Sequence, residues 1–200
     1  MNDTSNPNRP QDFRLISYLD ADLRRAQELL HGTNKPVSSM KLWLGILSPR
    51  FVPVLLCRLA HFFHILKLDP IAKIVSLLNF WFFGIEIAVR CPIGKGVFFT
   101  HTQGTVIGAF KIGVNAVIYQ GTTFGSKNLD FTYDSQHRPT LGDNVTIGSG
   151  AVILGGIHVG DNTIIGANSV VTRSTLAGST VVGIPARPVS TSQAPKSDNV

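Results

Sequence analysis

A six-residue period in the second half of the chain restricts its fold more than any other feature of the sequence. An aliphatic residue recurs at every sixth position, at Leu141, Ile147, Ile153, Val159, Ile165 and Val171. Glycine follows four of these residues, where the backbone turns with no side chain in the way, at Gly142, Gly148, Gly160 and Gly166. The same step is kept earlier by Ile112, Ile118 and Phe124. This period fits neither a helix nor a hairpin, and it is typical of a parallel β-helix.

In a parallel β-helix of this kind, three hexads form one triangular coil, and the aliphatic residue of each hexad points inward and stacks on its equivalents. The period is interrupted because Phe124 and Leu141 stand 17 residues apart. We therefore expect residues 125–140 to leave the coil as a loop. Long polar loops on a rigid repeat scaffold are usually functional or disordered, and the charged and aromatic residues of this one favour a function.

The first half of the chain differs in kind. Between residues 13 and 84 the apolar residues are spaced as in helices, with breaks expected at Pro36, Pro49, Pro53 and Pro70. The sequence thus predicts a mainly β protein: a short helical bundle of three to five helices, then a β-helix domain over residues 85–189. Residues 1–12 and 190–200 are rich in Asn, Ser and Pro, and we expect them to be disordered.

Composition excludes several classes of protein. A hydrophobic fraction of 44% is too high for a disordered chain of 200 residues. Two cysteines exclude a disulfide framework and favour a reducing compartment. The polar N-terminus lacks the basic and apolar regions of a secretory signal. We therefore expect a cytoplasmic protein.

The net charge of +6 is distributed unevenly. Residues 35–73 carry six cations against Asp69 alone, and this stretch is also the most apolar one. It lacks the roughly 20 uninterrupted apolar residues of a membrane-spanning helix. The stretch therefore packs in a core or a partner interface, or it lies on the inner face of an anionic membrane. The cations of the coil region are few and not clustered, so we expect no nucleic-acid partner.

Three segments add to the hexads, namely Gly84–Ile87, His101–Gly108 and Val182–Arg187. Together they resemble the serine acetyltransferase family of hexapeptide acyltransferases over about residues 84–189. The resemblance implies a left-handed β-helix, acetyl-CoA as co-substrate, and a homotrimer or a dimer of trimers. The short helical region and the Gly-Ile-Glu-Ile segment look most like the branch that acetylates sugar hydroxyls of surface polysaccharides.

The resemblance also implies which residues perform the chemistry. Transfer of an acetyl group to a hydroxyl requires a base, and His101 stands at the position of the family's catalytic histidine. Glu86, fifteen residues earlier, stands at the position of the partner aspartate that orients this histidine. The alternatives are a histidine with only a packing role and a structural salt bridge at Glu86.

Candidate substrate-binding residues follow from the same comparison. Thr100 stands where serine-specific enzymes have an aspartate, and an uncharged hydroxyl cannot pair with a substrate ammonium as a carboxylate does. The family places Arg then His before the loop proline, whereas this chain has His137 then Arg138. Both are candidates for acceptor binding, against the alternative of a solvated loop.

Four residues are candidates for binding the cofactor. Ser149 and Ala167 match the small residues that line the pantetheine slot in the family, although simple coil packing would explain them too. Arg187, after the closing Pro-Ala pair, and Lys127 in the loop are cations that can reach the phosphates.

The leading interpretation is therefore an acetyl-CoA-dependent O-acetyltransferase acting on a sugar hydroxyl, without a metal. L-serine is the alternative acceptor. A γ-type carbonic anhydrase is a second class on the same fold, but the coil region lacks the close histidine pair of that metal site. The third class is a non-catalytic β-helix scaffold.

Overall fold

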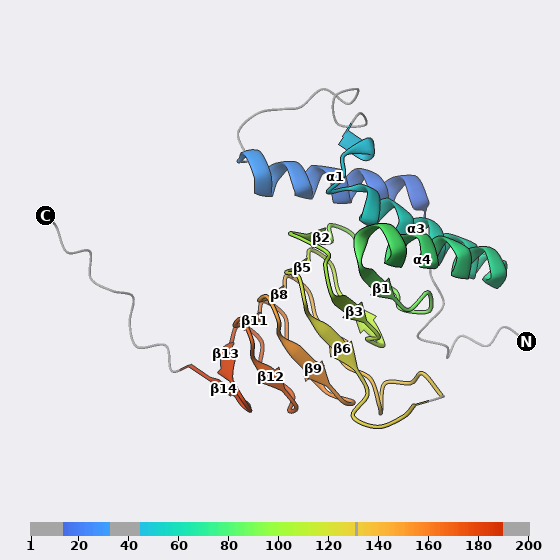
Figure 1. Ribbon diagram of the computed structural model, residues 1–200. Helices are drawn as coiled ribbons and strands as arrows, with labels where there is room; N and C mark the ends of the chain where they lie inside the picture. Colours follow the sequence, from blue (N-terminus) through green and yellow to red (C-terminus); the bar gives the residue numbers. More distant parts are fainter. Residues whose placement is uncertain (1–13, 33–44, 131, 190–200) are drawn as a thin grey trace, which may run out of the picture.

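The computed structural model describes residues 14–32, 45–130 and 132–189. A coil of short strands runs through the second half of the chain, and helices lie across its N-terminal end (Figure 1). The two ends expected to be disordered, residues 1–12 and 190–200, lie outside the described residues.

The described helices are α1 (Leu15–His31), the 3-10 turn η1 (Gly45–Leu47), α3 (Val52–Ile65) and α4 (Asp69–Phe83). Pro53 and Pro70 lie in the first turns of α3 and α4, where a proline has no helical N–H bond to lose. The helices are therefore interrupted next to these prolines, as expected, and each proline lies in the first turn of the helix that follows. Gly84 ends α4 in the left-handed conformation, with φ of 63°.

The strands form the three faces of the predicted coil. One face contains β1 (Ile85–Ile87), β3 (Thr105–Ile107), β6 (Thr123–Gly125), β9 (Val152–Leu154) and β12 (Val170–Val171). The second contains β4 (Lys111–Ile112), β7 (Thr140–Leu141) and β10 (His158–Val159). The third contains β2 (Phe98–Phe99), β5 (Val117–Ile118), β8 (Thr146–Ile147), β11 (Ile164–Ile165), β13 (Thr180–Gly183) and β14 (Ala186–Pro188).

All pairs within these faces are parallel except β13 with β14, which closes the coil as an antiparallel hairpin. The register places the hexad residues in columns, as in Ile118, Ile147 and Ile165, each at most 1% exposed. The β-helix predicted from the six-residue period is therefore confirmed. The chain leaves the coil between β6 and β7, within the residues expected to form a loop.

The corners of the coil require asparagine and glycine for two different reasons. Four asparagines adopt the left-handed conformation that the turns require, with φ between 55° and 58°: Asn115, Asn144, Asn162 and Asn168. The glycines after the hexad residues serve a different need, since a Cβ on Gly148 would lie 2.5 Å from the backbone nitrogen of Ala167 in the next coil. Close stacking of successive coils, rather than turn conformation, requires glycine there.

A buried ion pair joins the helices to the first coil. Arg58 of α3 donates from Nε to Oδ2 of Asp22 of α1 at 2.8 Å, and the two side chains are 1% and 0% exposed. Oδ1 of Asp22 also accepts the backbone N–H groups of Gly96 and Val97, at 2.7 and 3.0 Å. Nη2 of Arg58 donates to the carbonyl oxygen of Gly94 at 2.7 Å. This network fixes the helical layer against the turn that precedes β2.

Candidate active site

His101 lies at an enlarged corner of the coil, between β2 and β3. Phe98 pairs with Val117, and Val106 pairs with Thr123, in the next coil. Val106 therefore follows Phe98 by eight positions, whereas Thr123 follows Val117 by only six. The two additional residues belong to the corner that carries His101, and its side chain is exposed. An exposed imidazole on such a corner is accessible to a substrate, as a general base must be.

Ser149 and Ala167 lie at the same corner in the following coils. The N–H of Gly150 donates to the carbonyl oxygen of Gln120 at 2.9 Å, and that of Asn168 donates to the carbonyl oxygen of Ser149 at 2.8 Å. These bonds place Gln120, Ser149 and Ala167 in one column that continues from the His101 corner. Because the last two side chains are small, the backbone along this column remains open to a ligand.

Arg187 lies near the C-terminal end of this column. It pairs with Val182 across the β13–β14 hairpin, and Val182 is adjacent to the residue that pairs with Ile165. Its guanidinium donates to the carbonyl oxygen of Ala186 at 3.0 Å, and the side chain is exposed. The structure thus brings His101, Ser149, Ala167 and Arg187 to one edge of the coil.

Glu86 lies at the centre of β1, opposite Val106 of β3, and its side chain is exposed. Glu86 and His101 both lie in the first turns of the β-helix. Among the described residues, no hydrogen bond or ion pair joins Glu86 to His101. The orienting role of Glu86 therefore stays a prediction.

Thr100 precedes His101, and its hydroxyl oxygen is buried without a hydrogen-bond partner in the part of the chain that the structure describes. Its backbone N–H donates to the carbonyl oxygen of Ile118 at 3.1 Å. The sequence predicts that this hydroxyl contacts the substrate that accepts the acetyl group. In the structure such a contact requires a rotation of the Thr100 side chain.

Arg138 stabilises the loop between β6 and β7. Its guanidinium donates to a carboxylate oxygen of Asp130 and, at 2.9 Å, to the carbonyl oxygen of Gly108. It also lies over the ring of Tyr133, 4.3 Å from the centroid, and the Tyr133 hydroxyl donates to the carbonyl oxygen of Ala109. These contacts fasten the loop to the coil, so they do not support the acceptor-binding role expected of Arg138.

His137, by contrast, is about half exposed. Its Nδ1 lies 2.7 Å from Oδ1 of Asp134, which also accepts the backbone N–H groups of Gln136 and His137. Hydrogen bonds from Thr132 and His137 lower the pKa of Asp134. A proton held on Nδ1 by this carboxylate leaves Nε2 available to a ligand. Sequence reasoning missed Asp134 as a partner, although its spacing of three residues from His137 is a local signal.

Lys127 lies at a different corner from His101. Its Nζ donates to the carbonyl oxygen of Thr172 at 3.3 Å, and its chain passes within 2.9 Å of where a Cβ on Gly155 would lie. Both neighbours follow strands of the face that contains β6, β9 and β12. The structure therefore does not bring Lys127 together with Arg187 on the same edge of the coil.

The remaining reactive groups do not form a second site. Burial raises the pKa of the Cys57 thiol to about 11 and raises that of Cys91 further, so neither thiol is a nucleophile at neutral pH. Within the described ranges, no cluster of three or more His, Cys, Asp or Glu has the arrangement of a metal site.

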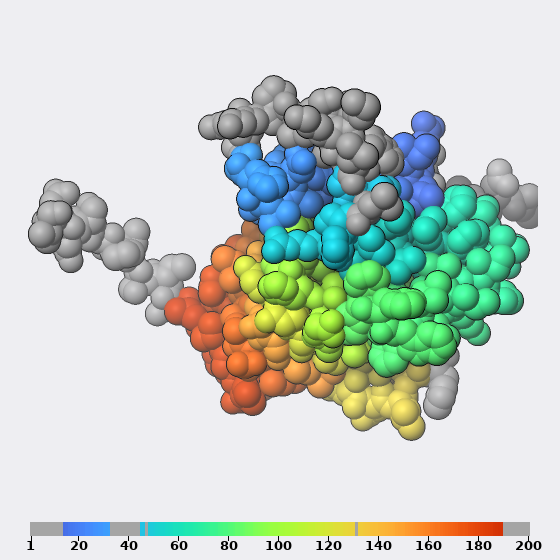
Figure 2. All heavy atoms as spheres, turned by 45° about the horizontal axis from the view of Figure 1, so that its top comes forward, coloured from blue at the N-terminus to red at the C-terminus, as the bar shows by residue number. Residues whose placement is uncertain are grey.

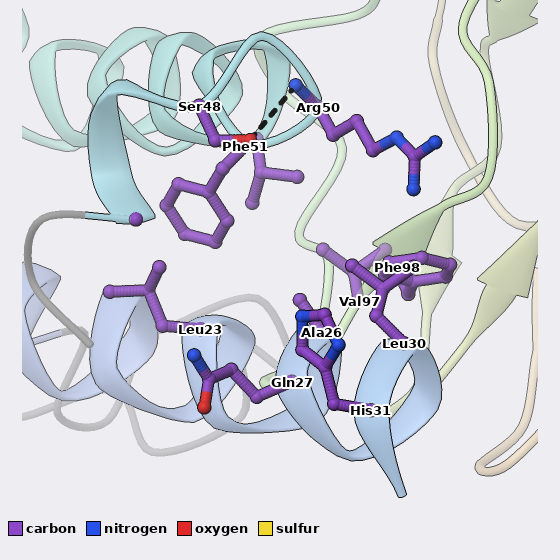
Figure 3. Close-up of a pocket in the computed structure, with 12 residues that line it drawn as sticks. Leu23, Ala26, Gln27, Leu30, His31, Ser48, Arg50, Phe51, Val97 and Phe98 are labelled. Atoms are coloured by element: carbon purple, nitrogen blue, oxygen red, sulfur yellow. Dashed lines mark hydrogen bonds between the residues drawn. The ribbon is translucent and has the colours of Figure 1, made fainter. Parts of the chain in front are cut away.

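A cavity of about 170 Å³ lies between α1, the start of α3 and β2 (Figure 3). Its lining contains none of the expected site residues.

Comparison with known proteins identifies the repeat and its relatives. Residues 138–173 match the family model of the bacterial transferase hexapeptide (six repeats). The chain is 36% identical to the serine acetyltransferase of Synechococcus elongatus over 88% of its own length and 65% of the relative's. It is 39% identical to the serine acetyltransferase of Helicobacter pylori over 77% of its own length and 89% of the relative's.

Solved structures agree with these relatives. The serine acetyltransferase of Neisseria gonorrhoeae in complex with serine has a TM-score of 0.75 and 29% identity, over 88% of this chain and 70% of that one. A serine acetyltransferase in complex with CoA has a TM-score of 0.74 and 26% identity, over 88% of this chain and 69% of that one. The chain spans slightly less than two thirds of some relatives, including the S. elongatus protein.

These comparisons contradict our expectation of a sugar acceptor. That expectation relied on the short helical region, but the chain covers 89% of the H. pylori serine acetyltransferase, which therefore has little room for a longer helical domain. It also relied on Thr100, whose buried hydroxyl says little about the acceptor. The extent and identity of these matches show that the chain belongs to the serine acetyltransferase family of hexapeptide-repeat transferases.

Proposed function

We propose that the protein transfers the acetyl group of acetyl-CoA to the hydroxyl of L-serine. The observation that supports this most is His101, exposed on an enlarged corner at the head of the column that contains Ser149 and Ala167. The relatives named above are serine acetyltransferases, and one solved structure of that family holds serine.

In this mechanism His101 removes the proton of the serine hydroxyl while the oxygen attacks the thioester carbonyl. The C–S bond then breaks, and the CoA thiolate leaves with the proton returned from His101. Glu86 accepts a hydrogen bond from the other imidazole nitrogen, which fixes the tautomer and stabilises the imidazolium. This mechanism requires no covalent acetyl-enzyme, and neither buried cysteine is placed to form one.

The column below His101 suits the cofactor. The pantetheine arm requires a slot with accessible backbone groups, and Ser149 and Ala167 leave the backbone open there. Arg187 lies at the end of the column, where its fork of donors reaches a phosphate. Lys127 lies at another corner, so we assign it no part in binding the same cofactor molecule.

The acceptor requires groups for its carboxylate and ammonium. His137, held by Asp134 on a loop that Arg138 fastens to the coil, is the exposed candidate for the ammonium, because its free Nε2 accepts a hydrogen bond. We propose that a further copy of the chain closes the site over the exposed His101, in a homotrimer with a dimer of trimers as the larger assembly. The two free cysteines favour a reducing compartment, and we propose the cytoplasm.

The experiment measures thiol release from acetyl-CoA with L-serine, D-serine and a panel of mono- and oligosaccharides. We expect saturable turnover with L-serine and a kcat/KM at least about 100-fold lower with every other acceptor. Turnover that does not exceed hydrolysis of acetyl-CoA with any acceptor would support the scaffold alternative and contradict the proposal. Light scattering of the same sample measures the assembly, and a monomeric mass would contradict the trimer.

A further inference from the structure

The surface of α4 that faces away from the coil is apolar. Its inner side is held by two hydrogen bonds: Ser76 Oγ donates to the carbonyl oxygen of Ile87 at 3.1 Å, and Asn79 Nδ2 donates to that of Pro53 at 3.0 Å. These two residues and the buried Ala72 share one side of the helix through their spacing of three and four. The opposite side is therefore fixed toward the outside of the chain.

We call this opposite side the outer face of α4. Ile74, Leu77 and Trp81 form its centre, because they are spaced by three and four residues. Ile71, Phe80 and Phe82 lie on its flanks, and the six side chains are exposed by 42% to 72%. Leu66 and Leu68, in the turn between α3 and α4, continue the face with 51% and 42% exposure. Figure 2 shows this helical hairpin at the surface, along the right-hand side of the molecule. Contiguous apolar surface of this kind marks an interaction site.

The border of the outer face is cationic. Lys67, Lys73 and Arg90 are exposed around the N-terminal end of α4. The neighbouring acid is Asp69, and its carboxylate is already engaged with His64, at 2.5 Å from Nδ1. That hydrogen bond, with smaller contributions from Lys73 and Arg90, lowers the pKa of Asp69. The border therefore retains a net positive charge at neutral pH.

An anionic lipid surface matches this combination better than a second copy of the chain. Cores of protein interfaces, whether two-fold or three-fold, are depleted in lysine. A two-fold contact, as between two trimers, would also bring the same cationic borders together. Tryptophan beside other aromatic residues, with lysines at the edge, is the pattern of helices that lie in the interfacial layer of a bilayer. No described helix is long and apolar enough to cross a membrane.

We propose that the outer face of α4 binds the surface of an anionic phospholipid membrane. Trp81, Phe82 and Ile74 enter the boundary between head groups and acyl chains, while Lys67 and Lys73 contact the lipid phosphates. The helix lies parallel to the membrane, with the coil directed away from it. This inference does not depend on the acceptor of the enzyme.

The experiment measures flotation of the full-length protein with vesicles of phosphatidylcholine, with or without 40% phosphatidylglycerol. We expect binding to the anionic vesicles and at least about tenfold weaker binding to phosphatidylcholine alone. The Ile74→Ser/Trp81→Ser variant is expected to lower binding at least tenfold, and Lys67→Glu/Lys73→Glu to remove the preference for anionic lipid. Leu176→Ser, a matched control with an 82% exposed side chain on the coil, is expected to bind like the wild type.

Three results would overturn this inference. The first is no flotation of the wild type, and the second is equal flotation of Ile74→Ser/Trp81→Ser. The third is a change of molar mass in that variant by light scattering, which would show that a second copy covers the face. Circular dichroism checks that the variants fold, and thiol release measured on the same samples keeps a failure of the enzyme assignment separate.

Discussion

His101 owes its exposed position to a local departure from the six-residue period. The sequence predicted this residue through its motif, but the hexad count did not show that its corner holds two additional residues. Only the pairing of Phe98 with Val117 and of Val106 with Thr123 reveals them. Register between coils depends on contacts between residues far apart in the chain, so a motif read in one coil cannot supply it.

Glu86 is the residue whose role most needs a test, since it lies one strand from the His101 corner with no hydrogen bond to that histidine. We expect Glu86→Gln to lower kcat at least about tenfold, because the amide cannot stabilise the imidazolium as a carboxylate does. The pH profile of kcat should shift as well. Glu28→Gln changes the only other glutamate of the chain and serves as the control. An unchanged kcat in Glu86→Gln would remove this residue from the mechanism.

Asp134 is expected to act through His137. The Asp134→Asn variant should raise the KM for L-serine about threefold to tenfold with little change in kcat, because His137 loses the carboxylate that holds its Nδ1. Steady-state kinetics of thiol release measure both constants. Asp20→Asn, at an exposed carboxylate on α1, should change neither. A fall in kcat at constant KM would place Asp134 elsewhere in the mechanism.

At the scale of elements, the join between helices and coil depends on residues that the sequence did not single out. Arg58 interrupts an apolar stretch, and its partner Asp22 is 36 positions away. No short spacing in the sequence links Arg58 to Asp22, whereas the hexads repeat at a fixed period that the sequence shows directly. The helices were therefore predicted as helices, but their attachment to the first coil was not.

Asp22→Asn should be strongly destabilising, because it leaves the guanidinium of Arg58 buried without its counter-charge. Breaking a buried pair of this kind costs about 3–5 kcal/mol. Urea unfolding followed by circular dichroism at fixed protein concentration measures the loss. Asp20→Asn, which removes an exposed pair with Arg24, should cost less than about 1 kcal/mol. Similar unfolding midpoints for the two variants would show that the buried network does not hold the helical layer.

The loop between β6 and β7 gives a prediction on pH. Hydrogen bonds from Thr132 and Arg138 depress the pKa of Asp130, and those from Thr132 and His137 depress that of Asp134. Each lowered pKa adds stability that is present above the ordinary carboxyl value of about 4 and is lost as the pH falls through the depressed value. Hydrogen exchange of residues 126–130 and 132–138 should therefore show the same protection factors from pH 7 to about pH 5. Loss of protection already near pH 6 would contradict this assignment.

At the scale of the whole molecule, the chain presents two surfaces that meet at the C-terminal end of α4. One is the edge of the coil with His101, Ser149, Ala167 and Arg187, and the other is the outer face of α4. Thr102, beside His101, donates from Oγ1 to the carbonyl oxygen of Phe83 at 2.7 Å. Composition predicted a basic and apolar stretch but not which of its residues remain exposed. That distinction arises because Ser76 and Asn79 fix the inner side of the helix against the first coil and α3.

The proposed assembly relates to the position of the site. A site on one edge of a single coil is open to water on its outer side, and in the proposed trimer a neighbouring copy encloses the thioester. The hexads and the family's motifs predicted the fold, which is confirmed, and His101 as the general base, which stays a prediction. The same motifs predicted the wrong acceptor, because Thr100 and the short helical region were given more weight than the similarity of the whole coil to serine acetyltransferases.

The most direct test of the account is the kcat of thiol release from acetyl-CoA with L-serine, compared between His101→Ala and His158→Ala. His158 is an exposed histidine of the same coil, outside the column of site residues, and so provides a matched control. The account predicts a loss of at least about 100-fold for His101→Ala and no change for His158→Ala. If His101→Ala retains the wild-type kcat, His101 is not the general base and the proposed mechanism is wrong.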